Sequence, residues 1–104
     1  MSKTAAVLWT VEEERCRQDD KWGEQNHSPA GWMAVLMEEV GEAAREVAQG
    51  WIEPVSLDGH SRRTAERLRQ ELIQVAAVAV AAIESLDRNE LRRRGENVEV
   101  ELVP

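Results

Sequence analysis

The chain has 104 residues and a formal net charge of −7, and charged residues make up 32% of it. This length corresponds to one domain, and an acidic chain without a block of lysine and arginine repels nucleic acid, so we expect no nucleic-acid partner. The longest apolar run, residues 75–83, is far shorter than the roughly 20 residues that cross a bilayer, and we expect no membrane partner. Cys16 is the only cysteine, which excludes an intrachain disulfide and, with no secretory cleavage pattern near the N-terminus, favours a cytoplasmic protein.

Two helices are predicted in the first half of the chain. Thr10 and Glu13 form a capping-box pattern that starts or re-caps a first helix ending near residue 20. Ser28 followed by Pro29 predicts the start of a second helix, which runs to about residue 49. Gly50 suits the left-handed conformation in which such a helix ends.

The second half of the chain predicts one long helix and a tail. Residues 52–60 contain proline and glycine and are predicted as a loop, and the third helix is predicted over residues 61–87. The charged residues that follow end in an alternating stretch, 98–102, typical of a short exposed strand or arm. The predicted organisation is therefore an all-α domain over residues 1–88 and a charged tail over residues 89–104.

The third helix predicts a partner chain. About 27 residues give a helix roughly 40 Å long, which exceeds the dimensions of a compact domain of this size. Its middle, VAAVAVAAI, is apolar on every side, and two sister helices cannot cover such a surface. We therefore expect a helical bundle that is completed by a second copy of the chain, most simply as a two-fold dimer.

Several glutamates border the faces that these helices are expected to pack together. Glu39, Glu42 and Glu46 fall within an arc of about 60° beside the apolar arc of the second helix. Glu71 lies at the edge of the apolar stripe of the third helix, so packing the two brings Glu71 toward Glu39 and Glu42. The predicted apolar positions are Trp32, Leu36, Val40, Ala43, Ala44 and Val47 on the second helix, and Leu68, Leu72, Val75, Ala79, Ala82, Ile83 and Leu86 on the third.

This acidic face has two interpretations. Glutamate-rich helix faces are commonly just solvated, because glutamate is a good helix former. Here, however, Arg45 is the single basic residue between Met33 and Val47, and like charges at helical spacing repel by a few tenths of a kcal/mol. A hard cation relieves this repulsion, and Mg²⁺ takes six oxygen ligands at about 2.1 Å. The pattern therefore favours a Mg²⁺ site, with Mn²⁺ as the alternative ion, over an ordinary solvated face.

The acidic residues also resemble a known signature. EEVGE at residues 38–42, followed by ELIQ from Glu71, is similar to the ExxE…ExxD signature of the all-α nucleoside triphosphate pyrophosphatases, which include the MazG-like proteins and their dUTPase and dCTP pyrophosphatase relatives. The resemblance covers about residues 12–87 and includes KWGEQNHSP upstream of the acidic helix and Trp51 just after it. It implies Mg²⁺-dependent hydrolysis of a nucleoside triphosphate to the monophosphate and pyrophosphate, in a homodimer or homotetramer.

The resemblance assigns roles to individual residues. Glu39 and Glu42 match the ExxE pair, Glu71 matches the first acid of ExxD, and Glu38 matches an extra acid before the pair. It thus implies four catalytic glutamates and a metal site made of Glu39, Glu42, Glu71 and Gln74. Gln74 departs from the pattern, because the family has aspartate there, and a glutamine offers only a neutral carbonyl oxygen. Glu46 and Glu66 are the alternative acids for this position. Glu38, if it is not a ligand, is expected to orient or deprotonate the attacking water.

Four residues around the acidic helix are candidates for substrate binding: Lys21, Trp22, His27 and Trp51. The tryptophans suit stacking on a base, although packing is the alternative for Trp22, and solvation is the alternative for Lys21. For His27 a structural role is favoured over contact with a base. The remaining tryptophans, Trp9 and Trp32, are predicted to pack inside the protein. The competing function, favoured by Gln74, is a non-catalytic interaction or nucleotide-sensing module of the same fold.

Overall fold

The structure is a computed structural model that describes residues 1–49 and 57–95. Three α-helices account for nearly all of these residues, and no strand occurs among them. The prediction of an all-α fold is confirmed. Gly50, Trp51 and the alternating stretch 98–102 lie outside the described residues. The helices are α1 (Lys3–Trp22), α2 (Pro29–Val47) and α3 (Leu57–Arg94).

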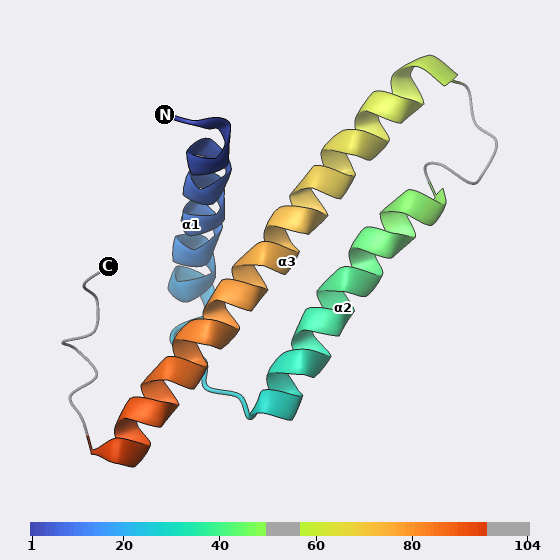
Figure 1. Cartoon of the computed structure of the whole chain (residues 1–104). Coiled ribbons are helices and arrows are strands. Elements are labelled where there is room, and N and C mark those ends of the chain that lie inside the picture. Colours follow the sequence, from blue (N-terminus) through green and yellow to red (C-terminus); the bar gives the residue numbers. More distant parts are fainter. Residues whose placement is uncertain (50–56, 96–104) are drawn as a thin grey trace.

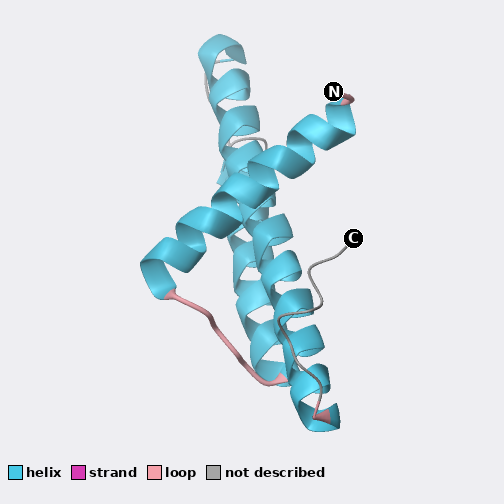
Figure 2. Cartoon of the chain, turned by 90° about the vertical axis from the view of Figure 1, so that its left-hand side faces the viewer, coloured by secondary structure: helices cyan, strands magenta, loops and turns pink. Residues whose placement is uncertain are grey.

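The long helix α3 forms the centre of the fold. Helix α2 lies beside it in the antiparallel direction, and α1 crosses the pair at a steep angle (Figures 1 and 2). Both α1 and α2 pack against α3. None of the described helices is long and apolar enough to cross a membrane.

Helix α1 begins earlier than the sequence pattern predicted. The Ser2 hydroxyl accepts a hydrogen bond from the Ala5 backbone N–H at 3.0 Å and so caps the helix. Thr10 lies inside the helix, where its hydroxyl donates to the Ala6 carbonyl at 3.2 Å. The prediction that Thr10 starts or re-caps the helix is wrong, because Ser2 supplies the cap one residue before Lys3. The helix ends at Gly23, whose positive φ of 74° suits a residue without a Cβ atom.

Helix α2 begins where Ser28 and Pro29 predicted. The Ser28 hydroxyl accepts a hydrogen bond from the Gly31 N–H at 3.1 Å, and Pro29 occupies the first turn, where its missing N–H costs nothing. This cap fixes the start of the helix that carries Glu39 and Glu42. It therefore sets the direction from which both glutamates approach α3.

Helix α3 is longer at both ends than predicted. Residues 57–60 were predicted as loop and residues 89–94 as tail, but both segments are helical. The loop prediction over 57–60 is wrong because a glycine costs a helix only about 1 kcal/mol and so does not by itself end one. At the other end Glu90 pairs with Arg93, which supports a further helical turn before Gly95 takes a φ of 77°.

The core lies between α2 and α3. Trp32 is 3% exposed and packs with Val78 and Ala81, which confirms its predicted packing role. The predicted core stripe of α3 is partly wrong, since Ile83 is 58% exposed and Leu72 and Leu86 are also exposed. Helix α1 contacts α3 from a second direction, so the buried positions of α3 are turned toward both neighbours rather than toward α2 alone. The exposed members of the predicted α2 arc are Val40, Ala44 and Val47.

Candidate metal and ligand site

Three glutamates meet where α2 packs against α3. Glu39 and Glu42 come from α2 and Glu71 from α3, and one carboxylate oxygen of each lies within 4.8 Å of the others. All three side chains are partly buried. The helix packing therefore brings together the three residues that the helical pattern placed at the borders of the two apolar faces, and we call them the glutamate cluster.

The glutamate cluster is an electrostatically unfavourable arrangement. Burial raises the pKa of Glu39, and the negative charges of Glu42, Glu71, Glu38 and Glu14 raise it further. Burial also raises the pKa of Glu71, followed by the charge of Glu42 and a hydrogen bond with it. Concentrated negative charge of this kind attracts a cation, and carboxylate oxygens are the ligands that hard divalent cations prefer.

Glu38 lies next to the glutamate cluster but outside it. Its side chain is exposed, one residue before Glu39, and its charge contributes to the raised pKa of Glu39. Glu46 has a similar relation to Glu71, whose pKa its charge helps to raise. These two residues extend the negative field to either side of the cluster along α2.

Gln74 is held by helix α1. Its carbonyl oxygen accepts a hydrogen bond from the Gln18 side-chain amide at 3.2 Å, and its side chain also bonds to the Glu14 carboxylate. Gln18 donates to Glu14 as well, at 3.3 Å. In this arrangement both ends of the Gln74 amide have partners on α1. Glu14 and Gln18 were not predicted as neighbours of Gln74, because nothing in the local pattern indicates which turn of α1 crosses α3 beside Gln74.

A pocket of about 320 Å³ lies between α1, α2 and α3. Apolar side chains from all three helices line it, together with polar and charged side chains from α1, the α1–α2 connection and α3. None of the three cluster glutamates is among its lining residues; Gln18, which lines it, bonds to Gln74, one turn of α3 after Glu71. The apolar lining residues are Trp22, Trp32, Val35, Val78 and Ala81.

The predicted substrate-binding residues have different positions. Trp22 is 60% exposed and lines the pocket, and the Lys21 ammonium lies 4.9 Å from the centre of its ring as a cation–π pair. His27 packs edge-on against Trp32 with 4.7 Å between the ring centres, which agrees with a structural role. Trp51 lies outside the described residues. The packing prediction for Trp9 is wrong, because Trp9 is 58% exposed on the free part of α1.

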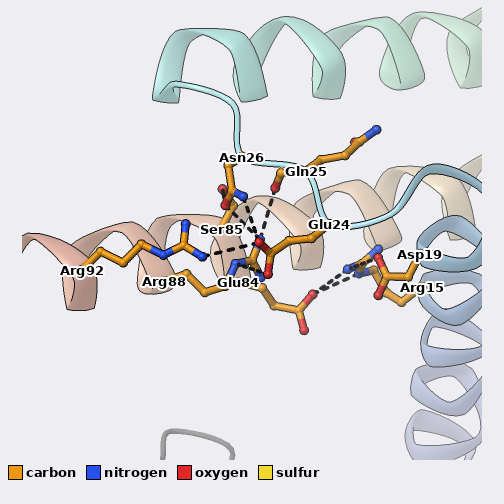
Figure 3. Close-up of polar contacts among 9 residues, drawn as sticks. All are labelled: Arg15, Asp19, Glu24, Gln25, Asn26, Glu84, Ser85, Arg88 and Arg92. Atoms are coloured by element: carbon orange, nitrogen blue, oxygen red, sulfur yellow. Dashed lines mark hydrogen bonds and ion pairs between the residues drawn. The ribbon is translucent and has the colours of Figure 1, made fainter. Parts of the chain in front are cut away.

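A network of ion pairs joins α1 and the α1–α2 connection to α3 (Figure 3). Arg15 of α1 bonds to Glu84 of α3 at 2.9 Å, and Arg88 pairs with Glu24 at 3.1 Å and donates to the Gln25 carbonyl. Arg88 lies inside α3, beyond residue 87, where the third helix was predicted to end, and it holds the connection between α1 and α2 against α3. Arg15, Asp19, Glu24, Gln25, Glu84 and Arg88 all line the pocket.

In comparisons with known proteins, no protein family, no curated protein and no solved structure matches this chain. The fold and the site by themselves define a coarse class, an all-α protein whose described part has a glutamate cluster and a separate, partly apolar pocket. A more specific function has to be argued from the chemistry that these residues support.

Proposed function

We propose that the chain is a Mg²⁺-dependent nucleoside triphosphate pyrophosphohydrolase of the MazG-like all-α type. The observation that carries this proposal is the convergence of Glu39, Glu42 and Glu71, with oxygens within 4.8 Å of one another, from two segments far apart in the sequence. The sequence resemblance assigned the same three residues to metal binding. A solvated acidic face needs no such convergence between two packed helices.

The donor set suits Mg²⁺. Two oxygens bound at about 2.1 Å to one ion are at most about 4.2 Å apart, so the 4.8 Å span of the cluster needs only small side-chain rotations. The three carboxylates are hard oxygen donors, and a hard ion also removes the repulsion that raises the pKa of Glu39 and Glu71. When bound, the ion supplies charge neutralisation for phosphate oxygens.

Metal binding and activation of the water are assigned to different glutamates. Glu39, Glu42 and Glu71 hold the ion and thereby fix the position of the triphosphate. Glu38, which is exposed beside them, is proposed to orient or deprotonate a water, the role that a general base has in hydrolysis. The reaction breaks the bond between the α and β phosphates and releases pyrophosphate.

The pocket is proposed to hold the nucleoside part of the substrate. Its volume of about 320 Å³ lies at the lower end of the range for small-molecule sites, about 300–1,000 Å³. The ring of Trp22 provides a face for stacking, and Lys21 beside it supplies a positive charge near the entrance. Trp51 remains a further candidate for base contact from the sequence alone.

A homodimer, or a homotetramer built from it, is part of this proposal, and exposed apolar side chains support it. Met33, Met37, Val40 and Val47 recur at helical spacing along α2, each at least 37% exposed. At 100° per residue these side chains point between about 60° and 140° away from the line of contact with α3, all in the same rotational sense. Monomers rarely leave such a continuous stripe in water.

Helix α3 carries a matching stripe: Leu72, Val80, Ile83 and Leu86, each at least 37% exposed. At 100° per residue, Leu72, Ile83 and Leu86 point about 80° to 140° away from Val78, the α3 residue that packs on Trp32, in the same rotational sense, whereas Val80 points almost directly away from α2. Because α2 and α3 are antiparallel, the two stripes face the same side of the pair. A second copy that packs its own α2 and α3 there would complete a four-helix bundle.

Sedimentation velocity tests the dimer. Ile83→Glu is expected to convert dimer to monomer, whereas Leu8→Glu on α1, where the wild-type side chain is 60% exposed against 58% for Ile83, serves as the matched control. A wild-type chain that sediments as a monomer at micromolar concentration contradicts the dimer.

The second candidate function is nucleotide sensing without turnover. Gln74 favours it, because the site has one carboxylate fewer than the family signature and the Gln74 amide is already bonded to α1. A sensor binds Mg²⁺ and nucleotide and is stabilised by them, but releases no pyrophosphate.

The deciding experiment measures pyrophosphate release with Mg²⁺ over a panel of ribonucleoside, deoxynucleoside and modified triphosphates. Glu42→Ala is expected to abolish the release while the helical circular dichroism stays intact, and Glu13→Ala, an exposed glutamate on α1, is the control. Undiminished turnover in Glu42→Ala refutes the metal-site assignment. Nucleotide-dependent thermal stabilisation without turnover in the wild type supports the sensor instead.

A further inference from the structure

One buried hydrogen-bond donor in the pocket between the three helices lacks an acceptor. The Trp32 side chain is 3% exposed and lines this pocket, and its indole N–H has no hydrogen-bond partner among the described residues. Within the same part of the chain, the other buried side-chain nitrogen without a hydrogen bond is Nε of Arg88, which lines the same pocket. That nitrogen lies 3.1 Å from the carboxylate of Glu24 as an ion pair, so the donor left without any acceptor is that of Trp32.

An unpaired donor of this kind specifies the chemistry of the group that would satisfy it. A buried N–H without an acceptor destabilises the folded state, and such donors are rare in folded proteins. The indole nitrogen of Trp32 donates one hydrogen bond and accepts none. The missing partner is therefore a hydrogen-bond acceptor, of which a carbonyl oxygen is the common uncharged example.

The charged groups of the pocket are already paired with one another (Figure 3). Arg15 bonds to Glu84 at 2.9 Å and to Asp19 at 3.0 Å. Arg88 pairs with Glu24 at 3.1 Å. Three carboxylates and two guanidinium groups thus line the pocket, and the small excess of negative charge repels an anion. A neutral ligand needs to break none of these pairs.

The apolar part of the lining sets the size and shape of the ligand. Val35, Val78 and Ala81 offer apolar surface beside the Trp32 ring, and Trp22 adds a second aromatic ring at the pocket. A cavity of about 150 Å³ is enough to bind benzene, so a pocket of about 320 Å³ admits a substituted six-membered ring. Small-molecule sites commonly combine such apolar walls with a few polar groups that fix the orientation of the ligand.

We propose that this pocket is a binding site for a neutral planar ring whose carbonyl oxygen accepts a hydrogen bond from the Trp32 indole N–H. None of the cluster glutamates lines the pocket, so this binding requires neither the metal ion nor a triphosphate. The inference rests on the proposed function only where the ring is the base of the nucleotide. A separate small molecule with the same chemistry is the other source of such a ring.

The competing account places the indole N–H inside the core, out of reach of any ligand. On that account the pocket meets only carbon atoms of the Trp32 ring, and the ring of His27, which packs edge-on against it with 4.7 Å between the ring centres, is part of the cover. A ligand would then touch the walls without affecting the N–H. The two accounts differ in whether the indole N–H responds to a ligand that carries a carbonyl oxygen.

The experiment follows the indole N–H signals of the ¹⁵N-labelled full chain by NMR, in EDTA, as N-methyl-2-pyridone is added. This probe is a neutral planar ring with a carbonyl oxygen, and toluene is the matched ring without an acceptor. The chain has four tryptophans. The Trp32 signal is identified by elimination with Trp9→Phe, Trp22→Phe and Trp51→Phe, which all leave Trp32 in place.

The pyridone is expected to shift the Trp32 N–H signal downfield until it saturates, whereas toluene should not. The backbone amides of Val35 and Val78 should shift along with it, which locates the probe in the pocket. Trp32→Phe removes the N–H but keeps an aromatic ring, and it should weaken pyridone binding about 2–10-fold relative to toluene, the usual worth of one hydrogen bond. If this variant does not fold, the shift in the wild type decides by itself.

Each outcome has one meaning. If the Trp32 N–H signal stays in place while the Val35 and Val78 amides shift, the competing account is correct, and if no lining residue responds to the pyridone, there is no such site. In both cases Mg²⁺-dependent pyrophosphate release by the wild type leaves the proposed function standing. Pyridone binding in a chain that releases no pyrophosphate refutes the hydrolase and leaves the site intact. When the probe binds, competitive inhibition of pyrophosphate release identifies the ring as the base of the nucleotide, and binding without inhibition identifies a separate ligand.

Discussion

Replacing Glu71 by glutamine is expected to stabilise the metal-free protein and to abolish its response to Mg²⁺. Glu71 is partly buried beside Glu39 and Glu42, and its pKa is raised by burial and by the charge of Glu42. A glutamine has nearly the same shape and helix propensity but no charge. The substitution therefore removes repulsion from the folded state while it also removes one of the proposed ligands.

The expected gain follows from the geometry of the cluster. Two unit charges about 4.8 Å apart repel by about 1 kcal/mol in bulk water, and by several times more at the lower effective dielectric of a protein surface. Because the cluster is partly open to water, the lower figure applies, and neutralising Glu71 relieves two such pairs. We expect the free energy of unfolding to rise by about 1–2 kcal/mol, which corresponds to roughly 4–8 °C in Tm for each kcal/mol in a domain of this size.

The gain should depend on pH with a definite sign. The pKa of Glu71 is higher in the folded than in the unfolded chain, so the folded state binds the proton more tightly. The wild type consequently loses stability as the pH rises from the unfolded pKa of the carboxyl through its folded pKa. Below this window the wild-type carboxyl is already neutral, and the advantage of Glu71→Gln should disappear. Above the window the advantage should be complete.

The assay is thermal or urea unfolding at one fixed protein concentration, at pH 4 and pH 8, with EDTA or with Mg²⁺. Glu13→Gln is the control, because it removes an exposed charge on α1, outside the glutamate cluster, and should change stability little at either pH. The result that refutes the reasoning is a Glu71→Gln protein that is less stable than the wild type at pH 8 without metal. Such a result would show that Glu71 makes a favourable contact that outweighs the repulsion. A Glu71→Gln protein that gains as much stability from Mg²⁺ as the wild type contradicts the ligand assignment.

Three further predictions concern the scaffold of the site. Ser28→Ala removes the cap of α2 and should lower the free energy of unfolding by about 1 kcal/mol in urea denaturation, because the Gly31 N–H loses its partner; an unchanged midpoint speaks against the cap. Trp32→Ala should cost about 3–5 kcal/mol by the same measurement, since it empties the core between α2 and α3, and a loss below 1 kcal/mol contradicts that core position. Glu84→Gln should weaken the attachment of α1 by no more than about 1 kcal/mol, because the pair with Arg15 is partly exposed, and raising the salt concentration should shrink the difference from wild type.

Local signals in the sequence predicted some elements well and others poorly. Ser28 and Pro29 predicted the start of α2 because a cap and a first-turn proline act through bonds within one helical turn. The capping-box pattern at Thr10 predicted the wrong helix start, because this pattern also occurs inside helices and Ser2 caps the helix earlier in the chain. The loop predicted over residues 57–60 failed because a single glycine lowers helix propensity without forbidding the helix.

In the candidate site, too, the residues that depend on local helical periodicity were predicted, and those that depend on contacts between distant segments were not. Glu39, Glu42 and Glu71 were predictable because helical periodicity places them beside the faces that pack. Glu14 and the pocket were not predictable, because they depend on where α1 crosses α3, and that crossing involves contacts between residues far apart in the sequence, such as Arg15 and Glu84. The same crossing explains why Ile83, predicted as core, is exposed: α1 packs on a different side of α3 and leaves the Ile83 side uncovered.

The metal site and the dimer interface are proposed on opposite sides of the α2–α3 pair, so each of them can be tested separately. Glu42 and Gln74 lie on the side that α1 covers, whereas Met37 and Ile83 lie on the opposite, apolar side. A second copy bound to the apolar side therefore leaves the glutamate cluster and the pocket facing away from it. Ile83→Glu should then break the dimer without weakening Mg²⁺ binding, and Glu42→Gln should remove Mg²⁺ binding without breaking the dimer. A loss of both properties in Ile83→Glu would mean that the partner copy contributes to the metal site, because the two sides of the pair would then be coupled.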